Sequence, residues 1–497
     1  MSGLNVIPDH IYGRRGFLRT AMLAGAVGML HDTPAYAAAQ EVRRYQFNAQ
    51  SFGAVGDGAH DDTDAIQKAL DHASRQGGGI VTLPAGKYLL RSSLVIPEEV
   101  VLEGISRGPI SHARQPGLQG NGRAVASPPA TKGPPASGLT LPDPPVVGIP
   151  ATAGLSTTLL AVAQRGKEDG NALITMGSNA ALRGLTIWYP HQNRDKTPVP
   201  YPWTIRMKGD NITVENVEIL NPWQGINADQ TQRHLIRNVT GQPLRMGIYL
   251  DRVYDIGRIE NVHFNPWWCH NQPIREFMYC HGESFVFGRS DWEYVFNTFS
   301  YGYHIGYRFI EGETGACNGN FLGIGADGSC EAVRVDQSQA WMEKRVPHGA
   351  NHPAAVDQLI APGLLITNGE FVSLNILSHP VETDPTQVVV AETNKGPVRF
   401  NNCSFWGPAR RIANLAGSGT VGFDGCTFVE WDAASCAIQA ESKKLLVNSC
   451  EFQQEGCQVT IGVGVRQAVI SGNIFTGQEH ITNNSTGSVE IGLNSAG

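Results

Sequence analysis

The chain has 497 residues, of which 17% are charged, and its formal net charge is −7. This mild acidic balance lacks the basic excess of a nucleic-acid-binding protein and says little else about partners. With 57 Gly and 29 Pro residues, the composition is that of a turn-rich β protein. Because a solenoid can become longer without splitting into domains, the number of domains cannot be inferred from the chain length alone.

Residues 1–39 are typical of an export signal. The pair Arg14-Arg15 precedes a short apolar stretch, residues 21–30, and then a run of small residues. This order predicts a twin-arginine-type signal peptide of a bacterial protein, with the Tat export machinery as a partner. The apolar stretch is too short to span a bilayer, although a lipid-anchored or uncleaved N-terminus is the alternative. We expect a periplasmic or secreted mature protein that begins near Ala38 or Gln40 and has no membrane segment.

Residues 45–108 contain a turn rich in Gly and Asp, then a helix, then short strands. Asp61 or Asp62 is expected to cap the helix, which Gly77–Gly79 end. A helix laid across the apolar end of a solenoid would close it, so capping explains the paired aspartates better than catalysis does. The expected buried stripe of the helix consists of Ala65, Ile66, Ala69, Leu70 and Ala73.

The stretch FGAVGDGAHDDTDAIQKAL, followed by GGGIVTLPAGKY, resembles the opening of the pectate-lyase-like superfamily of right-handed parallel β-helices. That superfamily includes polygalacturonase-related enzymes, exo-β-1,3-glucanases and phage tailspike depolymerases. The resemblance implies a carbohydrate-active protein without choosing the reaction. The NTD, GHG and RIK motifs of polygalacturonases are absent, the only DD is the helix cap, and the DPHD pattern of alginate epimerases is absent as well.

Residues 107–160 form an insertion rich in Pro, Gly and Ala, and such a stretch is usually either disordered or a functional lid. Beyond it, eleven short segments repeat one pattern, an alternating strand that passes through a small or Asn residue. These segments are LRGLTI, VENVEI, LIRNVT, IENVHF, VFNTFS, CNGNFLG, ITNGEF, FNNCSF, FDGCTF, VNSCEF and ISGNIF.

The repeat period predicts an all-β fold, a single-stranded parallel β-helix with about 22–24 residues per coil and an N-terminal capping helix. The steps from Asn216 to Asn238 and Asn261 are 22 and 23 residues. We expect one β-helix domain over residues 40–497, which the resemblance makes right-handed. The longer steps, from Asn261 to Asn297, from Asn320 to Asn368 and from Asn368 to Asn402, must carry loops. The long loops are expected at 265–285 and 337–362, and loops on one side of a solenoid usually form its binding face.

Nine cysteines are present. Three of them, Cys403, Cys426 and Cys450, occupy the same slot of consecutive coils, followed by Asn473, which indicates an internal packing stack. The spacing of Cys269-His270 and Cys280-His281 fits no common zinc site, so no metal site is predicted. A loop disulfide is expected instead, either Cys269–Cys280 or Cys317–Cys330.

Aligning the coils on the Asn slot brings charged residues together about nine positions upstream. This ladder consists of Lys208, Asp229, Asp251, Arg289 with Asp291, and Glu311 with Glu313, and Asp336 follows on a loosely aligned coil. Aromatic residues fall in the same span, and exposed rings beside charged groups are typical of sugar binding. They are Trp223, Trp267, Trp268, Trp292, Trp341, Tyr249, Tyr254, Tyr301 and Tyr303.

Paired carboxylates on adjacent coils favour a glycoside hydrolase. Asp229 and Asp251 should lie about 5 Å apart, so that repulsion raises one pKa and leaves an acid beside an ionised partner. Glu311 and Asp336 are further catalytic candidates. The predicted substrate-binding residues are Lys208, Trp223, Arg252, Trp267, Trp268, Arg289, Asp291, Trp292, His304 and Glu313. The main prediction is a secreted glycosidase that cleaves a polysaccharide or oligosaccharide, needs no cofactor and has no nucleic-acid partner.

Two alternatives stay open. A polysaccharide lyase would need a base for the C5 proton and a calcium ion or arginine to neutralise the uronate carboxyl, and Lys208, Arg252 and Arg289 are candidates. A non-catalytic carbohydrate-binding β-helix would keep its affinity when the acids are replaced. The slight excess of acids in the ladder favours a neutral glycan. The sugar, the linkage and the oligomeric state stay open.

Overall fold

The computed structural model describes residues 45–110, 156–343, 358–360, 363–374 and 385–497. Residues 47–497 form one compact unit. The expected signal peptide at 1–39 lies outside the described residues, as do most of the 107–160 insertion and much of the 337–362 loop. No helix in the described part of the chain is long and apolar enough to cross a membrane.

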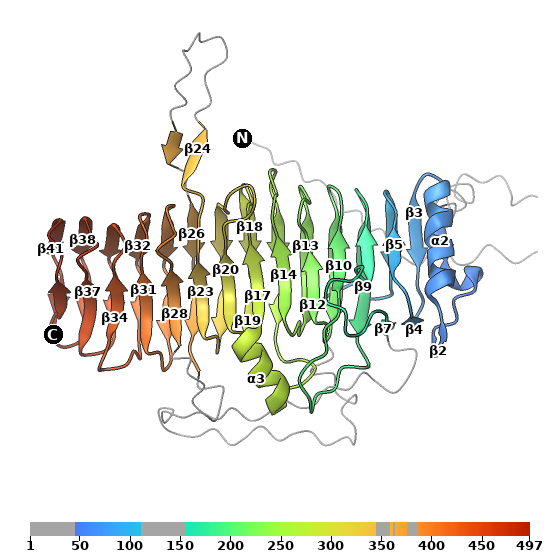
Figure 1. Cartoon of the computed structure of the whole chain (residues 1–497), viewed down its shortest axis with the longest axis horizontal. Helices are drawn as coiled ribbons and strands as arrows, with labels where there is room; N and C mark the ends of the chain where they lie inside the picture. The colour runs from blue at the N-terminus through green and yellow to red at the C-terminus, as the bar shows by residue number, and fades with distance from the viewer. Residues whose placement is uncertain (1–44, 111–155, 344–357, 361–362, 375–384) are drawn as a thin grey trace, which may run out of the picture. The chain divides into compact units, whose positions relative to one another are not determined.

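The described residues from 47 onward form a parallel β-helix, in which each coil adds strands in register with those of the coil before it (Figure 1). One face is a sheet of 13 parallel strands, called sheet B below. Its strands are β5 (Leu94–Ile96), β8 (Ile174–Met176), β10 (Trp203–Met207), β12 (Gln224–Asn227), β14 (Met246–Leu250), β17 (Glu283–Phe287), β20 (Ile305–Phe309), β23 (Glu331–Val335), β28 (Thr386–Val390), β31 (Arg411–Leu415), β34 (Cys436–Ala440), β37 (Cys457–Ile461) and β40 (Ile481–Asn483).

Most of the other strands form sheet A, which turns a corner within each coil. Before the corner lie β3 (Gly79–Thr82), β6 (Val100–Glu103), β15 (Arg258–Glu260), β18 (Glu293–Phe296), β21 (Gly319–Leu322), β26 (Leu364–Thr367), β29 (Val398–Asn401), β32 (Thr420–Asp424), β35 (Lys444–Asn448), β38 (Gln467–Ser471) and β41 (Ser488–Gly492). Running through the corner are β9 (Ala181–Trp188), β11 (Thr213–Ile219) and β13 (Leu235–Gly241).

After the corner lie β2 (Asp57–Asp61), β4 (Gly86–Leu90), β7 (Thr157–Ala161), β16 (His263–Phe264), β19 (Phe299–Tyr301), β22 (Gly325–Asp327), β27 (Glu370–Val372), β30 (Ser404–Trp406), β33 (Thr427–Phe428), β36 (Glu451–Phe452), β39 (Ile474–Phe475) and β42 (Ser495–Ala496). The chain also has β1 (Gln46–Asn48) and an antiparallel pair within the expected 337–362 loop, β24 (Trp341–Glu343) and β25 (Gln358–Ile360).

The corner of sheet A explains the repeated Asn. Every slot residue except Asn320 has a positive φ, for example 54° at Asn238 and 52° at Asn261, and Asn adopts this conformation more readily than other residues with a side chain. The side chains also form a ladder, in which Asn238 Nδ2 donates to Asn216 Oδ1 at 2.9 Å and Asn261 Nδ2 donates to Asn238 Oδ1 at 2.7 Å. The repeat pattern therefore marks one backbone corner in every coil.

One coil was aligned incorrectly from the sequence. Asn320 lies within β21, where it pairs with Tyr294, and the positive-φ residue of that coil is Gly323. Glu311 and Glu313 are therefore not in line with Asp229, because they fall in the loop between β20 and β21. The error arose because this segment carries both an Asn and a Gly, and either residue type can occupy a left-handed corner.

The helices cap and flank the coils. Helix α2 (Thr63–Arg75) follows the short 3-10 helix η1 (Ala49–Phe52) and buries the predicted stripe apart from Ala65, which is half-buried. Asp61 accepts hydrogen bonds from the backbone N and the hydroxyl of Thr63, the first residue of the helix. Asp62 occupies the N-cap position without a side-chain capping hydrogen bond, and its carboxylate instead accepts the backbone N–H groups of Val55 and Gly56. The second helix, α3 (Gln272–His281), occupies the segment 265–285 that was expected to be a loop.

The interior is a stack of apolar side chains. Phe405, Phe428 and Phe452 stack in successive coils with ring centroids 5.4 and 4.6 Å apart. Cys403, Cys426 and Cys450 are buried, which confirms the packing stack. The disulfide predictions are wrong, because none of the four cysteines of the two proposed pairs forms a disulfide.

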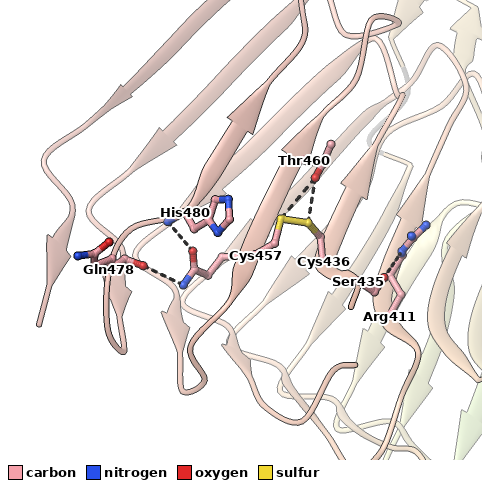
Figure 2. Close-up of a disulfide and its surroundings, with 8 residues drawn as sticks. Arg411, Ser435, Cys436, Cys457, Thr460, Gln478 and His480 are labelled. Carbon is pink, nitrogen blue, oxygen red and sulfur yellow. Dashed lines mark hydrogen bonds between the residues drawn. A yellow bond between two sulfur atoms is a disulfide. The ribbon is translucent and has the colours of Figure 1, made fainter. Parts of the chain in front are cut away.

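The structure instead contains the disulfide Cys436–Cys457 (Figure 2). These residues are register partners on neighbouring strands, with Cα atoms 4.6 Å apart and 21 positions apart in the chain. One coil of a β-helix therefore brings them together, whereas the sequence reasoning considered only pairs within loops.

Candidate functional site

The exposed face of sheet B carries a charged surface between β10 and β23. Its first row consists of residues in register on consecutive strands, namely Arg206, Asn227, Tyr249, Val286, Arg308 and Arg334. Continuing the same register by two residues places Lys208, Asp229 and Asp251 side by side where the strands end. Successive strands lie about 4.8 Å apart, so one sugar chain could contact several of these groups.

The carboxylate of Asp229 lies between the guanidinium groups of two arginines, Arg206 and Arg252. Arg252 binds it with two nitrogens, Nε to Oδ1 at 2.8 Å and Nη2 to Oδ2 at 2.5 Å, and Arg206 Nη2 lies 3.3 Å from Oδ2. The carboxylate is only 6% exposed. The hydrogen bonds that Arg252 donates to Asp229 raise the pKa of Arg252 further above its already high value. Asp229 therefore holds two guanidinium groups in fixed positions on an accessible face.

Asp251 has a different environment from Asp229. Its Oδ1 accepts the backbone N–H groups of Arg252 at 2.9 Å and Arg289 at 2.6 Å. A Cβ at either Gly288 or Gly312 would collide with this carboxylate, so the backbone of the next two coils closes over it. Asp251 is 5% exposed. Its geometry is that of a carboxylate that fixes the turns carrying Arg252 and Arg289.

Tyr249 lies between these charges on β14. Burial, with the negative charges of Asp251 and Asp229, raises the pKa of its phenol to about 12. Its ring packs near Trp203, with centroids 6.2 Å apart. At neutral pH Tyr249 therefore keeps its proton and can donate it to an oxygen bound at this face.

A second charged cluster continues along the face. Asp336 accepts hydrogen bonds from Arg308 Nε at 2.9 Å and Arg334 Nε at 2.7 Å. Arg308 also binds Glu283 at 2.8 Å, and Arg334 binds Glu331 at 3.0 Å. The predicted catalytic Asp336 thus lies on the same sheet as Asp229, three strands beyond Asp251, and is engaged by two arginines.

Several other predicted site residues surround the first row. Arg252 Nη1 binds Glu313 at 3.0 Å, and the side chain of Glu313 is 76% exposed. Arg289 pairs with Asp291 at 2.8 Å and lies over the ring of Tyr254. Glu311 and Trp292 are exposed.

The prediction of exposed aromatic rings is partly wrong. Trp223 and Trp268 are each only 7% exposed, and Tyr303 is fully buried. Trp223 packs on Phe277 of α3, because the helix covers a surface that the sequence left open. Two further predicted residues also lie along this part of the chain: Trp267 is half-buried beside His263, and Nδ1 of His304 lies 3.2 Å from the carbonyl of Tyr279.

Sequence reasoning missed Arg206, Arg308 and Arg334, and it considered Tyr249 only as an aromatic residue. A signal for them exists, because TIRMK, GYRFI and AVRVD each place an arginine between apolar residues of an alternating strand. Counting alternate residues back from Lys208 and Asp336 would have placed these arginines on the same outer face. No group of three or more His, Cys, Asp or Glu side chains suited to a metal ion occurs in the described part of the chain.

Comparisons with known proteins agree with this fold. Residues 46–267, which include Arg206, Asp229 and Arg252, match the family model "Rhamnogalacturonase A/epimerase, pectate lyase-like". Among curated proteins of Azotobacter vinelandii, alginate lyase 7 is 43% identical over 70 residues, which is 13% of this chain and 8% of the lyase. Mannuronan C5-epimerase AlgE3 is 46% identical over 69 residues, which is 12% of this chain and 4% of the epimerase.

These matches span less than a tenth of the length of the two curated relatives. Among solved structures, the N-terminal fragment of gene product 12 of bacteriophage phi29 has a TM-score of 0.55 at 12% identity, covering 93% of this chain and 72% of the fragment. At that identity the likeness concerns the fold alone. The coils and the family model together make this chain similar to the pectate-lyase-like superfamily of right-handed parallel β-helix proteins.

Proposed function

We propose that this chain is an exported polysaccharide lyase that cleaves a uronate-containing glycan by β-elimination. The observation that carries the proposal is the convergence of Arg206 and Arg252 on Asp229, beside the protonated phenol of Tyr249. The relatives support the same substrate class, since they are an alginate lyase and mannuronan C5-epimerases, proteins named for polyuronates.

The arginines supply what elimination needs first. Removal of the C5 proton is favourable only when the charge of the adjacent carboxylate is neutralised, and the guanidinium fork matches a carboxylate in two hydrogen bonds. Arg252 already holds one solvent-exposed carboxylate, that of Glu313. A substrate carboxylate could replace Glu313, while Asp229 keeps the guanidinium group in place from below.

The elimination then requires one base and one acid. Lys208 is the candidate base that takes the proton from C5, and the C–H electron pair becomes the C4–C5 double bond. The C4–O4 bond breaks, and O4 takes its proton from the phenol of Tyr249. Proton transfer from the ammonium group back to the phenolate restores both groups.

Hydrolysis is less well supported than elimination. Hydrolysis needs one protonated carboxyl group and one free carboxylate that face the same sugar bond. Asp229 instead contacts two arginines, and Asp251 lies beneath glycine backbone while it accepts two backbone N–H groups. Acidic side chains at this face act more naturally as supports for the cationic groups than as the reacting pair.

A second candidate is C5 epimerisation, which the matches to the mannuronan epimerases favour. Both reactions begin with removal of the C5 proton, and they differ in whether O4 leaves or a proton returns to the opposite face. The absence of the DPHD pattern places the lyase first.

The test is a panel of polyuronates and neutral glycans incubated with the full chain. Elimination predicts products that absorb in the ultraviolet in proportion to new reducing ends. Reducing ends without absorbance would instead show hydrolysis, and deuterium uptake at C5 without chain cleavage would show epimerisation. A parallel reaction with a chelator tests whether calcium assists the arginines.

Variants assign the roles. Tyr249→Phe should lower the rate of elimination by at least about a hundredfold, because the leaving oxygen loses its proton donor. The matched control is Tyr294→Phe, which removes a phenol from an exposed position on sheet A. Equal rates for the two variants would contradict the proposed role of Tyr249.

A further inference from the structure

A cavity of about 480 Å³ lies between two loops that both lead into sheet B. The first loop leaves β9 at Trp188 and enters β10 at Trp203. The second loop contains Trp268, continues into α3 and enters β17 at Glu283. The cavity is therefore at the edge where these strands begin, whereas Arg206 and Asp229 lie where β10 and β12 end. Both loops project on one side of the coils in Figure 1.

The walls of the cavity are held in place by buried glutamines. Gln192 makes two hydrogen bonds across the first loop, to the backbone N and O of Val199, each of 2.9 Å. Gln242 does the same for the second loop, since it binds the backbone N–H of Trp268 at 2.9 Å and the carbonyl of Cys269 at 2.7 Å. These contacts preorganise both walls before any ligand binds.

The two loops are also joined to each other. Asn271, directly before α3, donates a hydrogen bond of 2.6 Å from Nδ2 to Oδ1 of Asp195. Two tryptophans line the cavity, Trp188 from the first loop and Trp268 from the second. The polar rim comes from the first loop and includes Arg194, which is exposed and makes no hydrogen bond or ion pair that the described residues show.

We infer that this cavity is a second glycan subsite, which binds a uronate unit of the same polymer away from the bond that is cleaved. The half-buried indole ring of Trp188 provides apolar surface for the C–H face of a pyranose. The exposed guanidinium group of Arg194, for which the described residues show no ion pair, provides the counter-charge for a uronate carboxylate. The volume lies within the range of small-ligand sites. The inference rests on the proposed function for the identity of the sugar.

The position of the cavity gives the polymer a direction. Trp203, at the start of β10, lies between the cavity and Arg206. Its ring is 6.2 Å from that of Tyr249, which is in register with Arg206. Arg206 is three residues beyond Trp203 on β10, which is roughly 10 Å along the strand. A glycan that runs parallel to the strands would contact the cavity first, then Trp203, and then the row that contains Arg206 and Tyr249. Short oligomers could occupy only one end of this path.

The experiment compares Arg194→Gln and Trp188→Ala with the control Lys196→Gln, which changes an exposed cation of the same loop that does not line the cavity. Binding of the full chain to size-defined oligouronates is measured by calorimetry, and to polyuronate by affinity electrophoresis. Carboxyl-reduced oligomers of the same lengths serve as the uncharged probe.

We expect Arg194→Gln and Trp188→Ala to weaken binding of the longest oligouronates about tenfold, with the shortest oligomers unaffected. The effect of Arg194→Gln should vanish with carboxyl-reduced oligomers, whereas that of Trp188→Ala should remain. Equal affinities of Arg194→Gln and Lys196→Gln for every length would overturn the inference.

Two further outcomes separate the subsite from the proposed reaction. A length-dependent loss of binding in a protein that cleaves no polyuronate would support the subsite and refute the lyase proposal. Ultraviolet-absorbing products formed equally well by the wild type and both cavity variants, with unchanged affinity, would refute the subsite and support the lyase.

Discussion

A methyl group added at Gly257 should break a buried ion pair that joins two coils across a third. His234, Gly257 and Glu293 directly precede or begin β13, β15 and β18, and the register of these strands places them in one row. His234 Nε2 lies 3.1 Å from Glu293 Oε1, although a whole coil separates the two residues. Their side chains meet through the space that the glycine leaves empty.

The pair is enclosed on all sides. Both side chains have no exposed surface, and Glu293 also accepts a hydrogen bond from Ser290 Oγ at 2.6 Å. A Cβ at position 257 would lie closer to Glu293 Oε2 and to the imidazole of His234 than any real Cβ contact allows. Gly257→Ala must therefore separate the two groups and leave each of them buried without its oppositely charged partner. Separating such a pair costs about 3–5 kcal/mol.

The assay is guanidinium unfolding followed by far-ultraviolet circular dichroism. The control is Gly492→Ala, because a Cβ there meets nothing within 4 Å; its unfolding free energy should stay within about 0.5 kcal/mol of the wild type. If Gly257→Ala lowers the unfolding free energy by less than about 1 kcal/mol, the coils can shift to accommodate the added methyl group without separating the ion pair. That result would refute the reasoning.

The pH dependence gives an independent check. Burial opposes the charged form of His234, but the charge and hydrogen bond of Glu293 outweigh it, and the pKa of His234 is raised above 6.5. A raised folded-state pKa contributes stability that is complete below about pH 6.5 and is lost as the pH rises through the folded value. The wild type should therefore exceed Glu293→Gln in stability by more at about pH 6 than at about pH 9, and the opposite trend would contradict the assignment.

Three other predictions concern the ladder, the disulfide and the phenol. Asn238→Ala should destabilise the protein by about 2 kcal/mol, because it removes two side-chain hydrogen bonds and leaves a residue with a Cβ at φ 54°, whereas Asn238→Gly should cost less in the same unfolding assay. Replacing both Cys436 and Cys457 by Ser should lower the unfolding free energy by about 3 kcal/mol, and an unchanged value after reduction of the wild type would contradict this role. Because the pKa of Tyr249 is raised to about 12, its phenol should stay protonated at neutral and mildly alkaline pH. A pH–rate profile should therefore show no fall in the elimination rate that is due to ionisation of Tyr249 in this range.

The coil period could be determined from the sequence because it is a local property. Each coil must pass one left-handed corner, and Asn or Gly at that corner leaves a visible mark at Asn216, Asn238 and Asn261. The same marks put Asp229 and Asp251 on neighbouring coils, as the register shows. Asn320 and Gly323 occur close together in one coil, and the spacing alone identified Asn320 as the corner residue, although Gly323 occupies that position.

The sequence by itself determined the solenoid, its capping helix and the neighbouring positions of the charged residues, because periodicity in a parallel coil translates directly into stacking. Only the tertiary structure decided what each charge contacts. Asp229 and Asp251 look equivalent in the repeat, yet one binds two arginines and the other lies beneath the backbone of later coils. That difference depends on Gly288 and Gly312 and on loops between the coils, whose paths the repeat does not specify. For the same reason α3 covers Trp223, and Cys436 meets Cys457 one coil away.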